Sequence, residues 1–314
     1  MSLSPGTHGT LVVLLGPTGV GKTSVGVELA RALDTVILSC DSRQVYEEMC
    51  IGTAAPGPEE LAAVPHFFVR AIPVERYYNC WEFERQALAC LEELFARREV
   101  VLMVGGSMLY IDAVCRGMDE IPDVDPEIRA SVTRLHEREG IESLRALLHA
   151  LDPAFYREVD LKNARRVMHA VEICLTTGKP YSSLRTGRRK PRDFSIVKIG
   201  LTRDAGELRE NIHRRVDQMV AAGLEEEARG LYPRRHLNAL NTVGYKEWFD
   251  HFDGKISRDE AIRLIKRDTC RYAKKQLTWF RRDDEITWFS PGDAGLLLAF
   301  IRERAGGPSL ASKF

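Results

Sequence analysis

Short apolar runs alternate with longer stretches of helical periodicity over the first hundred residues. Runs rich in β-branched residues predict buried strands, and they are Thr10–Leu15, Thr35–Ser39, Glu99–Val104 and, between two prolines, His66–Ile72. Apolar side chains recur every three to four positions in Lys22–Leu33 and Cys80–Ala96, which predicts helices. Strands that alternate with helices indicate βαβ units, so we predict an α/β fold with a parallel sheet flanked by helices.

The pattern changes after Gly117. Residues Asp125–Thr177 have helical periodicity without a convincing strand, and a basic link, Ser182–Arg192, follows. Strand-like residues return at Phe194–Leu201, where we expect the chain to re-enter the sheet. The last predicted elements are helices at Ala205–Ala222, Glu225–Tyr232, Val243–Phe252, Arg258–Phe280 and Asp293–Arg304, and a strand at Ile286–Phe289. We therefore predict a core of residues 1–117 and 193–314, interrupted by an all-helical insertion at residues 118–192.

Length and composition fit this organisation. At about 150 residues per domain, a chain of 314 residues predicts roughly two domains. Its 44% hydrophobic and 29% charged residues are typical of a globular enzyme and exclude a collagen-like fibre or a small disulfide scaffold. The 45 basic and 45 acidic residues sum to zero net charge. Taken as a sum, zero charge argues against a nucleic-acid partner, because phosphate contacts require Lys and Arg.

The positions of the charges reverse that argument. Lys and Arg dominate Asn163–Arg192 and Ala261–Arg282, and each segment holds a single acid. The acids that balance them lie in Glu59–Glu60, Asp119–Glu127, Glu225–Glu227 and Asp283–Glu285. We interpret the run Glu225–Glu227 as an exposed helical face. Segregated charge permits a basic surface for one RNA, with an affinity that falls as salt rises.

Cysteine usage and the N-terminus bear on the compartment. The seven cysteines are dispersed without a C-x-x-C pair, as expected for thiols in a reducing environment. The apolar run Leu11–Leu15 is too short for a signal peptide or a membrane span, and no basic region precedes it. We predict a cytoplasmic protein without membrane contact.

The turn after the first predicted strand has the sequence GPTGVGKT and fits the pattern G-x-x-x-x-G-K-[ST] between a strand and a helix. Glycines allow tight turns that aim successive N–H groups at phosphate oxygens, and the helix N-terminus adds positive charge. The lysine adds a mobile cation, and the threonine hydroxyl can ligate Mg²⁺. The predicted site for a di- or triphosphate comprises Gly16, Pro17, Thr18, Gly19, Val20, Gly21, Lys22 and Thr23, with Mg²⁺ as cofactor and Thr23 as its ligand.

This loop does not identify the substrate. Nucleotide hydrolases and kinases with such a loop usually carry a second strand that ends in an Asp ligand for Mg²⁺. Here the strand Glu99–Val104 continues into Gly105, Gly106 and Ser107. The pattern disfavours a standard hydrolase and leaves a small-molecule kinase as an alternative.

Asp41 is the acid that directly follows a predicted buried strand. The carboxyl ends of parallel strands line the ligand crevice, so Asp41 should lie near the phosphate loop. A carboxylate there can bind Mg²⁺ or accept a proton from a nucleophile. The alternative interpretation is an Asp that caps the next helix.

Several blocks, in order, resemble the tRNA dimethylallyltransferase family, also called tRNA isopentenyltransferases. They include GPTGVGKT, DSRQVY, GGSMLYIDAVCRG, NARRVMHAVEICLTTGKP, RRVDQMVAAGLEEEA, NTVGYKE and YAKKQLTWFRR. The resemblance covers about residues 10–290. No Cys follows Cys270, so the zinc finger of some eukaryotic relatives is not expected and the chain is similar to the compact bacterial type.

The resemblance implies a prenyl transfer. The phosphate loop would hold the diphosphate of dimethylallyl diphosphate, with Mg²⁺ assisting. The five-carbon group would move to N6 of the adenosine immediately 3′ of the anticodon, in tRNAs that read UNN codons. The base would flip into a channel, and the helical insertion would contact the anticodon stem-loop. We expect a monomer. A tRNA-binding protein without turnover is a further alternative.

The resemblance also implies roles for individual residues. Asp41 would accept the amine proton or hydrogen-bond the amine, and Thr23 and Arg215 would face the leaving diphosphate. Implied contacts to tRNA are Asp41, Ser42, Arg43, Gln44, Ser107, Arg129, Arg165, Arg166, His169, Asn241, Thr242, Gly244, Tyr245 and Lys246. The family often has Arg where His169 stands.

Overall fold

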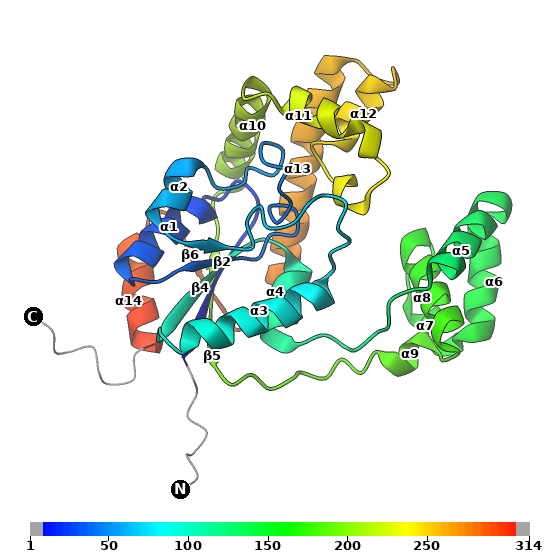
Figure 1. Cartoon of the computed structure of the whole chain (residues 1–314), viewed down its shortest axis with the longest axis horizontal. Coiled ribbons are helices and arrows are strands. Elements are labelled where there is room, and N and C mark those ends of the chain that lie inside the picture. The colour runs from blue at the N-terminus through cyan, green and yellow to red at the C-terminus, as the bar shows by residue number, and fades with distance from the viewer. Residues whose placement is uncertain (1–8, 306–314) are drawn as a thin grey trace, which may run out of the picture. The chain divides into compact units, whose positions relative to one another are not determined.

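A computed structural model describes residues 9–305. Its centre is a six-stranded sheet in which every pair of neighbours is parallel, in the order β3-β2-β4-β1-β5-β6 (Figure 1). The strands are β1 (Thr10–Leu15), β2 (Ile37–Ser39), β3 (His66–Phe67), β4 (Val100–Gly105), β5 (Ser195–Leu201) and β6 (Ile286–Phe289). The predicted α/β fold with a parallel sheet is confirmed.

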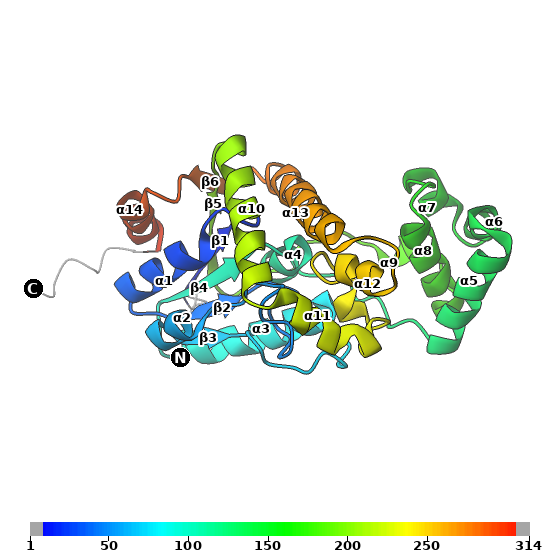
Figure 2. The ribbon, with the colours of Figure 1, turned by 90° about the horizontal axis from the view of Figure 1, so that it is seen from above.

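Helices cover both faces of the sheet. The helices with the sheet are α1 (Lys22–Ala32), α2 (Pro58–Ala63), α3 (Cys80–Phe95), α4 (Met108–Arg116), α10 (Ala205–Ala221), α11 (Leu224–Leu231), α12 (Lys246–Phe252), α13 (Arg258–Phe280) and α14 (Ala294–Ala305). Alternate residues of β1 serve opposite faces. Leu11 and Val13 belong to a core with α3 and α4, whereas Val12 and Leu14 belong to a core with α1 and α14. Helices α10 and α13 pack against each other (Figure 2).

Two predicted elements are shorter in the structure by three residues or more, and the strand predicted at Thr35–Ser39 begins at Ile37. The strand predicted at His66–Ile72 ends at Phe67, because Phe68 and Arg70 have φ of 61° and 48°, which interrupts extended backbone. The helix predicted at Val243–Phe252 begins only at Lys246, after Gly244 with φ of 98°. Both differences arise from left-handed backbone that the apolar pattern does not record.

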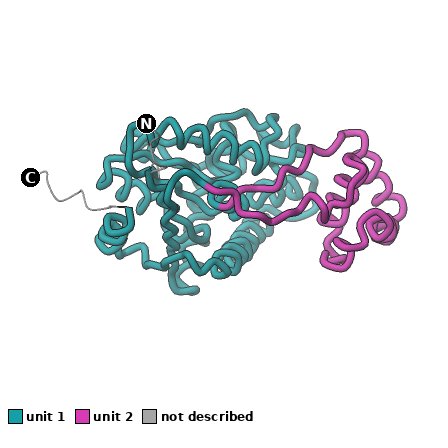
Figure 3. Tube along the Cα trace, turned by 90° about the horizontal axis from the view of Figure 1, so that it is seen from below, with its two compact units in different colours: residues 1–115, 192–314 teal, residues 116–191 magenta. Residues whose placement is uncertain are grey.

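The chain divides into two compact units, residues 1–115 with 192–314 and residues 116–191 (Figure 3). The second unit contains α5 (Pro126–Glu139), α6 (Ile141–Leu151), α7 (Pro153–Glu158), α8 (Ala164–Thr177) and α9 (Tyr181–Leu184). Its core includes Leu144, Leu148, Val167 and Val171. Buried Asp152 accepts the N–H groups of Phe155 and Ser182, which ties the start of α7 to the start of α9.

Within residues 9–305, no helix is long and apolar enough to cross a membrane.

Candidate active site

The phosphate loop lies between β1 and α1, and its glycines adopt conformations that other residues rarely do. Gly19 and Gly21 have φ of 84° and 106°. A Cβ atom on Gly19 would lie 2.7 Å from Cγ1 of Ile212 on α10. Backbone conformation and close packing therefore both require glycine at position 19.

Lys22 points back into the loop. Its Nζ donates to the carbonyl oxygens of Gly16 at 3.0 Å and Pro17 at 2.9 Å. Burial and the positive charge of Arg215 lower the pKa of Lys22 to about 8, and they outweigh the opposite effect of Asp41. Two cations and one carboxylate thus share a small volume, an excess of positive charge that a bound anion would balance.

Arg215 comes from α10. Its Nη2 donates to the carbonyl of Thr53 at 3.3 Å, while its Nε is buried without a hydrogen-bond partner in the described part of the chain. Burial lowers the pKa of Arg215, and the nearby Asp41 and Glu60 oppose that shift. A buried donor without a partner is costly in free energy, so this guanidinium is suited to an anionic ligand.

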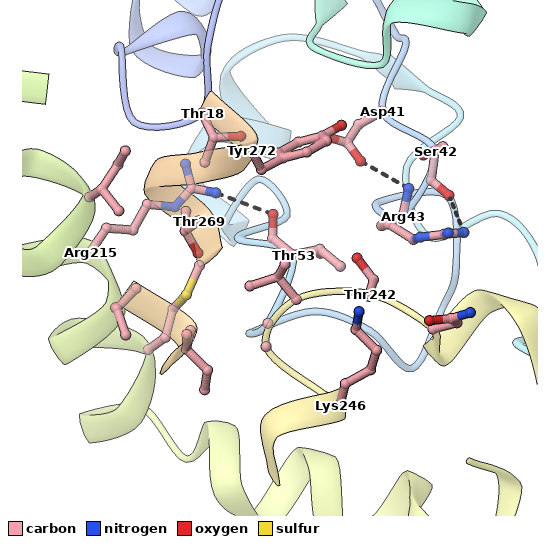
Figure 4. Close-up of a pocket in the computed structure, with 18 residues that line it drawn as sticks. Thr18, Asp41, Ser42, Arg43, Thr53, Arg215, Thr242, Lys246, Thr269 and Tyr272 are labelled. Carbon is pink, nitrogen blue, oxygen red and sulfur yellow. Dashed lines mark hydrogen bonds between the residues drawn. The ribbon is translucent and has the colours of Figure 1, made fainter. Parts of the chain in front are cut away.

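Asp41 follows β2 and caps a tight turn. Its Oδ1 accepts the N–H of Arg43 at 2.9 Å (Figure 4) and the N–H of Gln44 at 3.3 Å. The Ser107 hydroxyl accepts the N–H of Ser42 at 2.8 Å and fixes the same turn. The capping interpretation is correct in its hydrogen bonds, although a turn follows instead of a helix. Asp41 also lines a cavity, so capping does not exclude a chemical role.

The cavity has a volume of about 330 Å³. It brings together nine of the nineteen residues predicted for the site within the sheet-containing unit, namely Thr18, Asp41, Ser42, Arg43, Arg215, Asn241, Thr242, Gly244 and Lys246. Figure 4 shows the Tyr272 ring beside Asp41 and Lys246 extending toward the cavity. Burial and the charge of Asp41 raise the pKa of Tyr272 to about 12, so its phenol is protonated at neutral pH.

Sequence interpretation missed the apolar wall of this cavity. Ile212, Val216 and Met219 on α10, with Ile265 on α13, line it. The α10 residues recur every three to four positions with Arg215 among them, so helical spacing would have placed them on one face.

Other predicted residues lie outside the lining. Gln44 donates through Nε2 to the carbonyls of Thr53 and Ala54, and Ser107 is 7% exposed. The Tyr245 side chain is fully buried and its hydroxyl donates to Glu227. Contact of this residue with tRNA stays a prediction. These side chains instead hold the segments that form the cavity.

Four predicted tRNA contacts belong to the helical unit. Arg129, Arg165, Arg166 and His169 are exposed there. Glu172 lies 3.9 Å from Arg129 Nε and 4.0 Å from His169 Nδ1. Desolvation and the charge of Arg129 lower the pKa of His169, which favours the neutral imidazole. Contact of these residues with RNA stays a prediction.

Glu227 corrects the interpretation of the acidic run as an exposed face. Its carboxylate accepts the N–H groups of Cys50 at 2.9 Å, Ile51 at 2.7 Å and Gly52 at 2.9 Å. It also accepts the Tyr245 hydroxyl at 2.7 Å. The exposed-face interpretation is wrong for Glu227, because the residue's place on α11 turns it toward residues 50–52, the chain just before Thr53.

Replacing Glu227 with alanine should loosen this segment. Three N–H groups lose a charged acceptor, and such bonds contribute about 1.5–3 kcal/mol each. We expect amide hydrogen exchange in residues 50–54 to accelerate at least tenfold, measured by mass spectrometry. The matched control is exposed Glu226→Ala on the same helix. Unchanged exchange in the Glu227 variant would show that the carboxylate does not hold the segment.

The phosphate loop alone supplies only some of the ligands that a Mg²⁺ ion needs. The described residues contain no group of three or more His, Cys, Asp or Glu side chains that could hold a metal ion. Mg²⁺ usually keeps several waters and takes its remaining ligands from one or two protein groups and substrate phosphates. The Thr23 hydroxyl at the start of α1 and the Asp41 carboxylate are chemically suited to that arrangement.

This fold and site define a P-loop protein of the α/β class with a carboxylate near the phosphate loop. The sequence matches the IPP transferase family over residues 44–283, and the chain belongs to that family. Because the chain belongs to this family and not to a kinase family, the small-molecule kinase that the phosphate loop left open is disfavoured.

Two similar proteins of known name are tRNA dimethylallyltransferases. tRNA dimethylallyltransferase 1 of Bacteroides fragilis is 51% identical over 94% of this chain and 98% of its own length. tRNA dimethylallyltransferase 2 of Porphyromonas gingivalis is 53% identical over 93% of this chain and 98% of its own.

Two solved structures are similar in fold. The tRNA isopentenylpyrophosphate transferase of Bacillus halodurans has a TM-score of 0.69 and 35% identity, over 94% of this chain and 96% of its own. A eukaryotic dimethylallyltransferase acting on tRNA has a TM-score of 0.76 at 22% identity, over 95% of this chain and 77% of its own. The second likeness shows a shared fold.

Proposed function

We propose that this protein transfers the dimethylallyl group of dimethylallyl diphosphate to N6 of the adenosine immediately 3′ of the anticodon, in tRNAs that read UNN codons. The products are N6-(dimethylallyl)adenosine and diphosphate. The observation that carries the proposal is the cavity that joins Asp41 and Arg215 beside a phosphate loop, in a chain of the IPP transferase family. The proposal includes action as a cytoplasmic monomer.

The donor side follows from the chemistry of an allylic diphosphate. Its C1–O bond breaks readily because the resulting cation is delocalised, and the departing oxygens need positive charge. Lys22, Arg215 and the loop N–H groups supply that charge. Mg²⁺, held through Thr23 and diphosphate oxygens, would neutralise further charge on the leaving group. The apolar wall from α10 suits the five-carbon group and limits water, which would capture the cation.

The acceptor side centres on Asp41. As the N6–C1 bond forms, the amine loses a proton, and the Asp41 carboxylate would accept it. The Tyr272 ring beside Asp41 suits stacking of a flipped adenine. Asp41–Gln44 and Asn241–Lys246 are proposed to contact the flipped base and its neighbours, and Ser107 supports the first segment.

Recognition of the anticodon stem is proposed for the helical unit. Arg129, Arg165, Arg166 and His169 offer exposed donors to the RNA backbone. The lowered pKa of His169 favours the neutral imidazole, which can contact RNA through hydrogen bonds.

Incubation with dimethylallyl diphosphate, Mg²⁺ and an unmodified UNN-reading tRNA tests the function. We expect nucleoside mass analysis to show one dimethylallyl group on the adenosine next to the anticodon. The control is the same tRNA with guanosine at that position. Absence of a mass gain would refute transfer, and stoichiometric tRNA binding without product would favour a binding protein. Phosphorylation of a metabolite by ATP would favour a kinase.

A further inference from the structure

The side-chain amide of Gln276 connects two turns that are distant from it in sequence. Gln276 lies on α13 and is 2% exposed. Its Oε1 accepts the N–H of Thr18 at 2.8 Å, and its Nε2 donates to the carbonyl of Gly106 at 2.7 Å. Thr18 belongs to the phosphate loop and Gly106 to the turn after β4. One buried amide therefore joins α13, the phosphate loop and the β4–α4 turn.

Packing around this amide is close. A Cβ atom on Gly106 would lie 2.4 Å from Nε2 of Gln276, 3.2 Å from the Gly16 oxygen and 3.5 Å from Nζ of Lys22. The amide and the loop lysine therefore meet at the same turn. Rotating the amide by half a turn would oppose its NH₂ to the Thr18 N–H and its oxygen to the Gly106 oxygen. Two repulsive contacts exclude that orientation, and in the observed one the amide both donates and accepts.

Neither bond is used by the chemistry of the proposed reaction. The bond to Thr18 occupies one N–H at the entrance of the loop, and Val20 donates its N–H to the Pro17 carbonyl at 3.3 Å. The N–H groups of Gly19 and of Gly21 to Thr23 remain for an anion. A loop that is ordered before the ligand arrives loses less conformational entropy on binding, which favours affinity.

We propose that Gln276 is a positioning residue that holds the phosphate loop in the conformation that binds the donor's diphosphate. This inference rests on the proposed function, in which that loop takes the diphosphate of the prenyl donor. Gln276 itself contacts neither reacting atom, and its effect passes through Thr18 and Gly106.

The test compares Gln276→Met and Gln276→Glu with the native protein. Calorimetric titration with inorganic diphosphate and Mg²⁺ measures the affinity of the phosphate loop for diphosphate. A filter-binding titration with tRNA measures RNA affinity. For Gln276→Met, which keeps the volume but makes neither hydrogen bond, we expect a dissociation constant for diphosphate about tenfold higher and a tRNA dissociation constant within threefold.

The Glu variant separates positioning from charge. At pH 7.5 its carboxylate cannot donate to the Gly106 oxygen, and diphosphate binding should weaken as in the Met variant or more. Burial at this position should raise the pKa of the introduced carboxyl, so that its protonated form at pH 5.5 can donate to Gly106 and accept from Thr18. Its affinity relative to the native protein should then recover, whereas that of Gln276→Met should not.

Gln86→Glu is the matched control. Its amide on α3 also has both ends bonded, since Oε1 accepts the Tyr78 hydroxyl and Nε2 donates to Glu82. We expect unchanged diphosphate binding there. Native diphosphate affinity in Gln276→Met, loss of tRNA affinity alone, or loss of cooperative unfolding would each overturn the positioning role. If the native protein binds diphosphate but prenylates no tRNA, the proposed function fails while the titrations still decide on Gln276.

Discussion

Replacing Asp41 with asparagine should lower the rate of prenyl transfer by about two to four orders of magnitude while tRNA affinity changes less than threefold. A positioned base contributes rate enhancements of this size. Asparagine keeps an oxygen for the N–H groups of Arg43 and Gln44, so the turn that Asp41 caps remains bonded. Single-turnover kinetics with saturating donor and tRNA measure the loss.

This substitution separates the two interpretations of Asp41. If the residue only caps the turn, Asp41→Asn should transfer at nearly the native rate and Asp41→Ala should not. Asp204→Asn is the matched control, because Asp204 Oδ1 accepts the N–H groups of Gly206 and Glu207 in the same spacing at the start of α10. A near-native rate in Asp41→Asn would remove Asp41 from the base role.

The sequence was sufficient to predict the strands of the sheet wherever consecutive residues are buried. All six residues of β1 are buried, so an unbroken apolar run marks the strand. The two-residue β3 could not be bounded in this way, because its end is set by the backbone of Phe68 and Arg70. Apolar patterning reports which side chains are buried and does not report a left-handed residue.

The candidate site also contains some residues that could be predicted from the sequence and others that could not. The phosphate loop and Asp41 could be predicted because each depends on neighbours in sequence, a glycine-rich turn or a strand end. Gln276 and Glu227 could not, since their bonded partners Thr18 and Cys50 are 258 and 177 residues away. A glutamine on a basic helix and a glutamate in an acidic run have ordinary composition, and only the fold gives them partners.

The pKa of Lys22 gives donor binding a defined pH dependence. The protonated amine binds phosphate oxygens, so the contribution of Lys22 to affinity should be constant below about pH 7 and fall as pH rises through about 8. Above that value, the dissociation constant of the native protein should rise up to tenfold per pH unit, because an added proton accompanies binding. Direct titration with dimethylallyl diphosphate between pH 6 and 9.5 measures the trend.

Lys22→Met should weaken donor binding about 100-fold at pH 7, because charge-assisted bonds to phosphate contribute about 1.5–3 kcal/mol each. The ligand's own ionisation cancels in the ratio of variant to native dissociation constants. That ratio should therefore shrink toward one as pH rises above 8, where the native lysine also loses its charge. Lys255→Met, an exposed lysine paired with Asp250 outside the cavity, is the control and should bind as the native protein does. A ratio that stays constant from pH 6 to 9.5 would mean that Lys22 binds the donor with an ordinary pKa. A ratio of one throughout would place the diphosphate away from this loop.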